Sequence, residues 1–151
     1  MIGDLADLVI ARLRDGVPGL ISVIGAVEAA DLVKSGQRPQ RLPAAIVLPI
    51  GDEADDGALL GETAWDQDLT QRIGVVVIHR DAGDATGHAA RRKAVPVVKQ
   101  VVDTLVGWEA DHGFGPLHYQ RARLHGLTSG AVWQQFDFAA RTTLTHLLSE
   151  A

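Results

Sequence analysis

Gly74-Val75-Val76-Val77-Ile78 is the stretch that decides the fold, because it joins four β-branched residues in an unbroken apolar run. β-Branched side chains favour strands, and an apolar run without polar alternation is typical of a strand buried on both faces. The run therefore predicts the centre of a strand over about residues 68–80. A second run, Ala44-Ala45-Ile46-Val47-Leu48, ends at Pro49 and predicts another buried central strand.

Three segments with helical periodicity and one short strand surround these two runs. The helices are predicted over residues 2–13, 27–34 and 86–105, and the strand over residues 20–24. Thr86 is the expected N-cap of the longest helix. Pro96 lies inside that helix and predicts a kink or a restart, because its ring removes one backbone hydrogen bond.

The last two strands are predicted to form a hairpin. They cover about residues 117–127 and 132–145, and the loop Thr128-Ser129-Gly130 between them is short enough for a hairpin turn. Apolar and polar residues alternate along the second strand, as in a half-exposed antiparallel strand. The order predicts a single α+β domain over residues 1–151, with a mixed, mostly antiparallel sheet, helices packed on one face and a closing C-terminal hairpin.

The composition excludes several classes of protein. The chain has 151 residues, a net charge of −5, a pI near 5.6 and no cysteine. Disulfides and cysteine-based zinc sites are therefore excluded, and no apolar run approaches the roughly 18 residues of a membrane span. Met1-Ile2-Gly3-Asp4-Leu5 carries acid where a signal peptide carries Lys or Arg, so secretion by that route is not expected. The acidity also argues against a duplex-DNA binder.

Acidic residues are concentrated in residues 51–70. This segment holds seven acidic residues and neither lysine nor arginine, which predicts a long solvated loop between the two central strands. A calcium loop is not expected, because Ala54 and Thr63 stand where the EF-hand pattern needs an oxygen ligand and a bidentate Glu. Trp65 lies within the segment and either packs back onto the core or anchors another chain.

No motif for catalysis, metal binding or cofactor binding stands out. The six histidines show neither H-x-x-x-H nor H-E-x-x-H spacing, and a P-loop is missing. Ser129 stands one place late for a nucleophile elbow. The protein is therefore expected to be no enzyme and to hold no metal or cofactor. The basic cluster Arg91-Arg92-Lys93 lacks interleaved aromatic residues and predicts a solvated helix end.

The order of segments along the chain carries more information than any single motif. The segments are residues 26–32, Pro43-Ala44-Ala45-Ile46-Val47-Leu48-Pro49, Gln67-Asp68-Leu69-Thr70-Gln71-Arg72-Ile73-Gly74-Val75-Val76-Val77, Leu105-Val106-Gly107-Trp108, Val132-Trp133-Gln134-Gln135-Phe136 and Arg141-Thr142-Thr143. This ordered set, over about residues 17–146, resembles the tail terminator (tail completion) proteins of long-tailed bacteriophages.

The resemblance implies a structural virion protein that caps the phage tail tube as a homohexameric ring. Such a ring stops tube polymerisation and joins the tail to the head, so the expected partners are further copies of the chain, the major tail tube protein and the head-tail connector or stopper protein. The implied location is the head-proximal end of the tail, after assembly in the host cytoplasm. DNA would pass through the ring without sequence-specific binding, and no membrane is involved. The alternatives are a neck or head-tail connector protein of the same particle, or a non-enzymatic α+β binding module.

Segregated charge predicts a contact between neighbouring subunits. Residues 72–99 carry six basic residues against two acidic ones. A head-to-tail ring would place this basic surface against the acidic segment of the next subunit. The candidate interface residues are Asp52, Glu53, Asp55, Asp56, Trp65, Asp66, Asp68, Arg72, Arg80, Arg91, Arg92 and Lys93.

Overall fold

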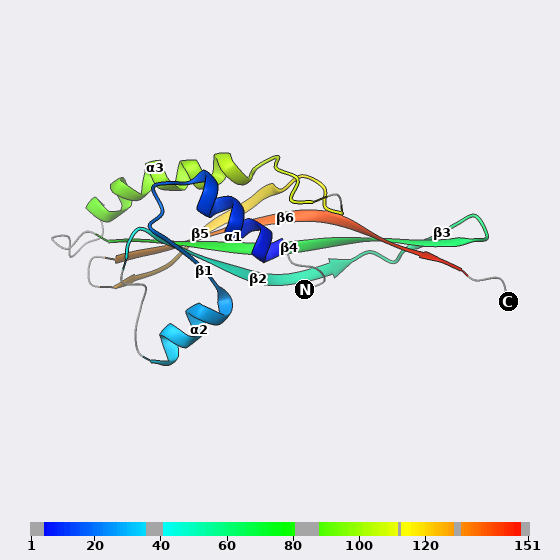
Figure 1. Cartoon of the computed structure of the whole chain (residues 1–151), viewed down its shortest axis with the longest axis horizontal. Helices are drawn as coiled ribbons and strands as arrows, with labels where there is room; N and C mark the ends of the chain where they lie inside the picture. The colour runs from blue at the N-terminus through cyan, green and yellow to red at the C-terminus, as the bar shows by residue number, and fades with distance from the viewer. Residues whose placement is uncertain (1–4, 36–40, 81–87, 112, 129–130, 149–151) are drawn as a thin grey trace.

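The computed structural model describes residues 5–35, 41–80, 88–111, 113–128 and 131–148. This part of the chain forms three helices and six strands (Figure 1). Their order is α1 (Leu5–Gly16), β1 (Ser22–Gly25), α2 (Ala26–Lys34), β2 (Ala44–Ala54), β3 (Ala58–Leu60), β4 (Ala64–Arg80), α3 (His88–Leu105), β5 (His118–Thr128) and β6 (Ala131–Leu147). The predicted α+β class and the closing hairpin of β5 and β6 are confirmed.

The six strands form one sheet in the order β1-β2-β4-β6-β5, with β3 beside β4. Among the described pairings β1 and β2 run parallel, and all the others are antiparallel. The predicted buried strand is β4, which lies at the centre of the sheet. There Val75 stands between Val47 of β2 and Phe136 of β6.

The central strands are covered on both faces, as their unbroken apolar sequence requires. Successive residues of β4 point to opposite sides of the sheet. Val75 and Val77 join the larger core cluster with α1 and α3, whereas Val76 and Ile78 join a smaller one with α2. Two helices therefore share one face as expected, while α2 packs on the other (Figure 1). A strand with two apolar faces needs cover on both of them.

Helix α3 continues through Pro96 without the restart that the sequence predicts. Pro96 is exposed, and its ring removes one intrahelical hydrogen bond without ending the helix. The predicted N-cap, Thr86, lies outside the described residues.

The acidic segment is not the loop that the sequence predicts but part of a projecting β structure. Strand β2 continues past a bulge near Pro49 to Ala54, and β3 and the start of β4 follow. With the end of β6 they form a narrow extension beyond the helices, here called the arm and comprising residues 52–68 and 141–148 (Figure 1). Strands β4 and β6 pair along 17 residues each. This continuous ladder stabilises strands whose local composition favours a loop.

Candidate assembly surfaces

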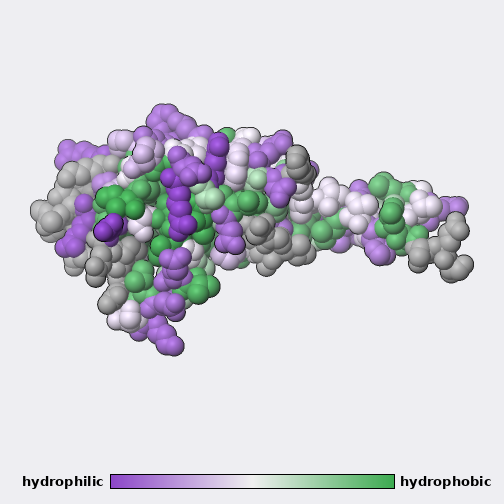
Figure 2. All heavy atoms as spheres, viewed as in Figure 1, coloured by the Kyte–Doolittle hydropathy of each residue, from purple (hydrophilic) through white to green (hydrophobic). Residues whose placement is uncertain are grey.

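The arm carries apolar side chains beyond the reach of the helices. Strand β6 extends seven residues from buried Ala140 to Leu147, which corresponds to roughly 23 Å. Leu59 and Leu60 of β3 are 60% and 53% exposed, and Leu147 is 75% exposed. Figure 2 shows hydrophobic atoms near the end of the arm among hydrophilic ones. An apolar patch at the end of a projection is typical of an interaction surface.

Trp65 packs within the arm and does not reach the core. It lies on β4 opposite Leu59 of β3 and His146 of β6, and it is 36% exposed. Its ring lies against Gly57, where an added Cβ would come within 3.0 Å of the ring atoms Cζ2 and Cε2. Gly57 also has a φ of +74°, which favours glycine. The indole therefore closes the turn between β2 and β3 and leaves part of its surface open to another chain.

Three of the predicted interface acids stabilise the arm itself. The carboxylate of Asp55 accepts hydrogen bonds from the amides of Gly57 and Asp68, at 2.9 and 3.1 Å. The hydroxyl of Thr143 donates to Asp68 at 3.0 Å, and the hydroxyl of Thr145 donates to Asp66. Each of these threonines stands directly opposite its acid in the β4–β6 register. Cross-strand hydroxyl groups thus make carboxylates compatible with strand positions.

Two other acids of the arm are exposed and have no partner among the described residues. Asp56 and Glu62 make no hydrogen bond or ion pair with the described residues. Asp52 is also exposed, opposite Gln71 on β4. Asp56 and Glu62 flank the apolar tip, so the arm presents apolar surface edged with negative charge.

Arg72 and Glu53 form an ion pair within one chain. The guanidinium Nη1 of Arg72 lies 2.7 Å from Oε2 of Glu53, across the β2–β4 ladder. The sequence places these two residues on opposite sides of a contact between subunits. The strand register pairs them within one chain, and their contacts between subunits stay a prediction.

The other predicted basic residues lie far from the arm. Arg80 is exposed at the end of β4, 14 residues from Asp66, which corresponds to roughly 46 Å of strand. Arg92 is exposed near the start of α3, and the side chains of Arg91 and Lys93 lie outside the described part of the chain. Arg80 and Arg92 therefore do not meet the acids of the arm within one chain, and their contact with those acids between subunits stays a prediction.

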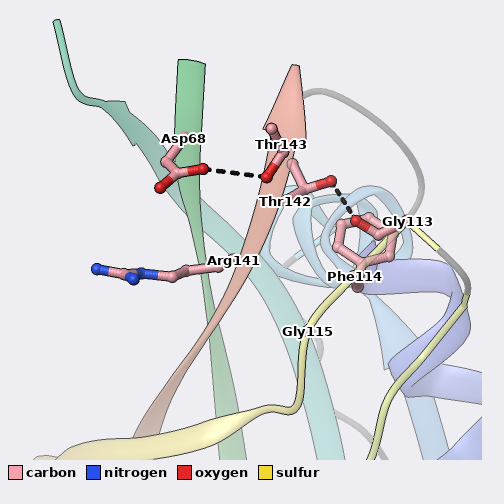
Figure 3. Close-up of a pocket in the computed structure, with 7 residues that line it drawn as sticks. All are labelled: Asp68, Gly113, Phe114, Gly115, Arg141, Thr142 and Thr143. Carbon is pink, nitrogen blue, oxygen red and sulfur yellow. Dashed lines mark hydrogen bonds between the residues drawn. The ribbon is translucent and has the colours of Figure 1, made fainter. Parts of the chain in front are cut away.

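A groove of about 570 Å³ lies where the arm leaves the body (Figure 3). On one side the amide of Gly115 donates to the carbonyl of Arg141 at 2.7 Å, and the hydroxyl of Thr142 donates to the carbonyl of Gly113. Asp68 and the Arg141 side chain lie on the other side. One carboxylate and one guanidinium do not supply an acid–base pair. The described residues also contain no group of three or more potential metal ligands.

Most of the chain is similar to a known protein family. Its sequence matches the model of the family described as phage tail terminator protein over residues 4–147. The chain belongs to this family. A chain in the solved structure titled "Virion of native gene transfer agent (GTA) particle" is similar with a TM-score of 0.57 and 20% identity, and the match covers 93% of this chain and 95% of that one. That likeness shows a shared fold. No curated protein matches the sequence significantly.

Membership of the tail terminator family makes the chain a structural protein of the phage tail. The resemblance inferred from the order of segments is confirmed. Proteins of this family are components of the virion and are generally not enzymes. No helix in the described ranges is long and apolar enough to cross a membrane.

Sequence reasoning missed one exposed surface, strand β5. Residues 118–125 of this strand are exposed at every position, and residues 117–130 contain Arg121 and Arg123 but no acidic residue. The absence of acid was visible in the sequence. The exposure was not, because it depends on where the helices pack.

Proposed function

We propose that this tail terminator family protein forms a homohexameric ring on the head-proximal end of the phage tail tube. The ring stops polymerisation of the major tail tube protein and offers its other face to the head-tail connector. The observation that carries this proposal is the family match over residues 4–147. The family is named for terminating tails.

The distribution of charge supports a ring built from head-to-tail contacts. Acidic residues lie on the arm, and Arg80 and Arg92 lie at the opposite end of the body. Unlike surfaces at two ends of one chain favour heterologous contacts, which close into a ring when the rotation between subunits allows it.

A ring also explains how a small subunit recognises a completed tube. Six copies bind six equivalent sites at once, so each subunit contact can be weak while the whole ring binds tightly. Free subunits in the host cytoplasm then do not compete strongly for single tube subunits. Capping therefore follows tube assembly and does not block it.

A tube assembly assay tests this proposal. Purified tube protein is polymerised with increasing amounts of the chain, and tube lengths and ends are measured by negative-stain microscopy. We expect growth to stop and the effect to saturate near six chains per tube end, far below the concentration of tube subunits. A chain that binds portal-side connector rings and ignores isolated tubes would contradict capping and favour a connector function.

A further inference from the structure

Residues 118–125 of strand β5 are exposed on both faces of the strand. In the described part of the chain it pairs with β6 alone, and residues 118–125 are all exposed. Two of these side chains, Tyr119 and Leu124, are large and apolar, with 41% and 55% of their surface exposed. A strand without cover on either face is unusual in an isolated domain and indicates a surface that another chain covers.

One of the two arginines on β5 is held in place by an ion pair. Nε of Arg121 donates to the buried carboxylate of Asp137 at 2.7 Å, and Nε2 of Gln135 donates to the other oxygen of that carboxylate, also at 2.7 Å. The Arg121 side chain nevertheless remains 64% exposed. Arg123 is exposed and has no ion-pair partner among the described residues. A guanidinium held by one nitrogen keeps its other donors available for a second carboxylate.

We propose that the arm of one copy of this chain lies along strand β5 of the next copy. The arm supplies Asp56 and Glu62 beside the apolar Leu59 and Leu60. Strand β5 supplies Arg121 and Arg123 beside the apolar side chains of Tyr119 and Leu124, which complements the arm. The inference rests on the proposed ring and names the surfaces that close it. In this contact the basic partner of the arm is β5, a surface separate from the predicted one in residues 72–99.

The strand register makes the contact intermolecular. The first residue of β5, His118, pairs with Ala139 of β6, whereas Leu147 at the tip of the arm stands opposite Ala64. Eight residues of continuous strand, or roughly 26 Å, separate the two positions. The arm cannot fold back onto β5 of its own chain without breaking the β4–β6 ladder, so a second copy supplies the partner.

The contact is formed mainly by side chains. Register shifts interrupt β5 between Tyr119 and Arg121 and between Leu124 and Gly126. Bulges of this kind blunt an edge and disfavour a continued backbone ladder. Ion pairs and apolar contacts between the arm and β5 therefore provide the specificity.

Cross-linking tests the contact directly, because the natural chain contains no cysteine. Glu62→Cys and Arg123→Cys are prepared as two separate full-length proteins, mixed, and treated with a short bismaleimide linker. We expect a cross-linked dimer in this mixture. The matched control replaces Arg123→Cys with Lys34→Cys, an exposed position on α2, and should give no dimer.

Charge reversal gives an independent readout. Arg123→Glu should raise the concentration at which rings form by about tenfold or more, since the contact recurs at every interface of the ring. The Asp56→Lys/Glu62→Lys variant should raise this concentration as well. A single chain that combines these two substitutions with Arg123→Glu should recover much of the assembly. Lys34→Glu changes the charge equally and should leave assembly unchanged. Thermal unfolding of each variant verifies that it folds.

The outcomes separate this contact from the proposed function. If rings form but neither Glu62→Cys nor Asp56→Cys is cross-linked to Arg123→Cys, the contact is refuted and capping is not. Cross-linked open chains that do not cap tubes support the contact and contradict capping. If neither rings nor cross-links form, with or without tubes, both the contact and the capping function are refuted.

Discussion

Replacing Gly57 with alanine tests whether the packing of Trp65 on Gly57 stabilises the arm. Gly57 has a φ of +74°, and a Cβ there would come within 3.0 Å of two atoms of the Trp65 ring. A left-handed conformation costs an alanine roughly 1–2 kcal/mol, and overpacking adds about 1–3 kcal/mol. We expect Gly57→Ala to destabilise the arm by about 2–5 kcal/mol.

Gly61→Ala is a matched control in the same arm. Gly61 has a φ of +65°, and a Cβ there would meet no atom within 4 Å. It therefore carries the backbone cost of roughly 1–2 kcal/mol without the clash. The difference between the two variants isolates the packing of Trp65 on Gly57.

Hydrogen exchange of the arm amides measures both effects. Local opening of the arm leaves the body folded, so exchange in the arm should accelerate while residues 75–78 remain protected. We expect roughly 5- to 30-fold faster exchange in Gly61→Ala and a further fivefold or more in Gly57→Ala. Equal acceleration in the two variants would refute the packing argument. Loss of protection at residues 75–78 would refute the independence of the arm.

Three further substitutions address the interface, the core and the buried carboxylate. Trp65→Ala should retain cooperative thermal unfolding but weaken ring or tube contacts in native mass spectrometry; loss of cooperative unfolding would make Trp65 a core residue. Phe138→Ala should lower the free energy of unfolding by about 3–5 kcal/mol in denaturant titrations, because Phe138 is fully buried; a change below 1 kcal/mol would contradict its place in the core. Asp137→Ala should cost about 1–3 kcal/mol in the same titration, because it leaves the buried amide of Gln135 without its acceptor, and Gln135→Leu in that background should recover part of the loss.

The central strands were predictable because their signal is local. An unbroken apolar run such as residues 74–78 has two faces to bury wherever it lies, and the structure places it in the centre of the sheet. The closing hairpin was predictable for the same reason, since its turn signal is local. The half-exposed second strand was not, because Gln135 and Asp137, on the face expected to be exposed, are buried. The position of α2 on the opposite face also follows from the two-faced strands, and it corrects the prediction that the helices pack on one face.

The arm was not predictable from local composition. Glycine and acidic residues in residues 51–70 disfavour strands, and the stabilising partners lie far along the chain. Thr143 and Thr145 reach Asp68 and Asp66 only once the register of β4 and β6 is known. The same holds for Glu53 and Arg72, which the register of β2 and β4 brings together within one chain.

The oligomeric state, alone and on tubes, tests the central claim most directly. Native mass spectrometry of the purified chain from low to high micromolar concentration, with negative-stain images of the same samples and of mixtures with purified tubes, provides the measurement. The account predicts closed rings of six 16.1 kDa chains, about 97 kDa, in solution or at tube ends. A chain that remains monomeric in solution and leaves tube ends bare, or that forms rings of another stoichiometry, would contradict it.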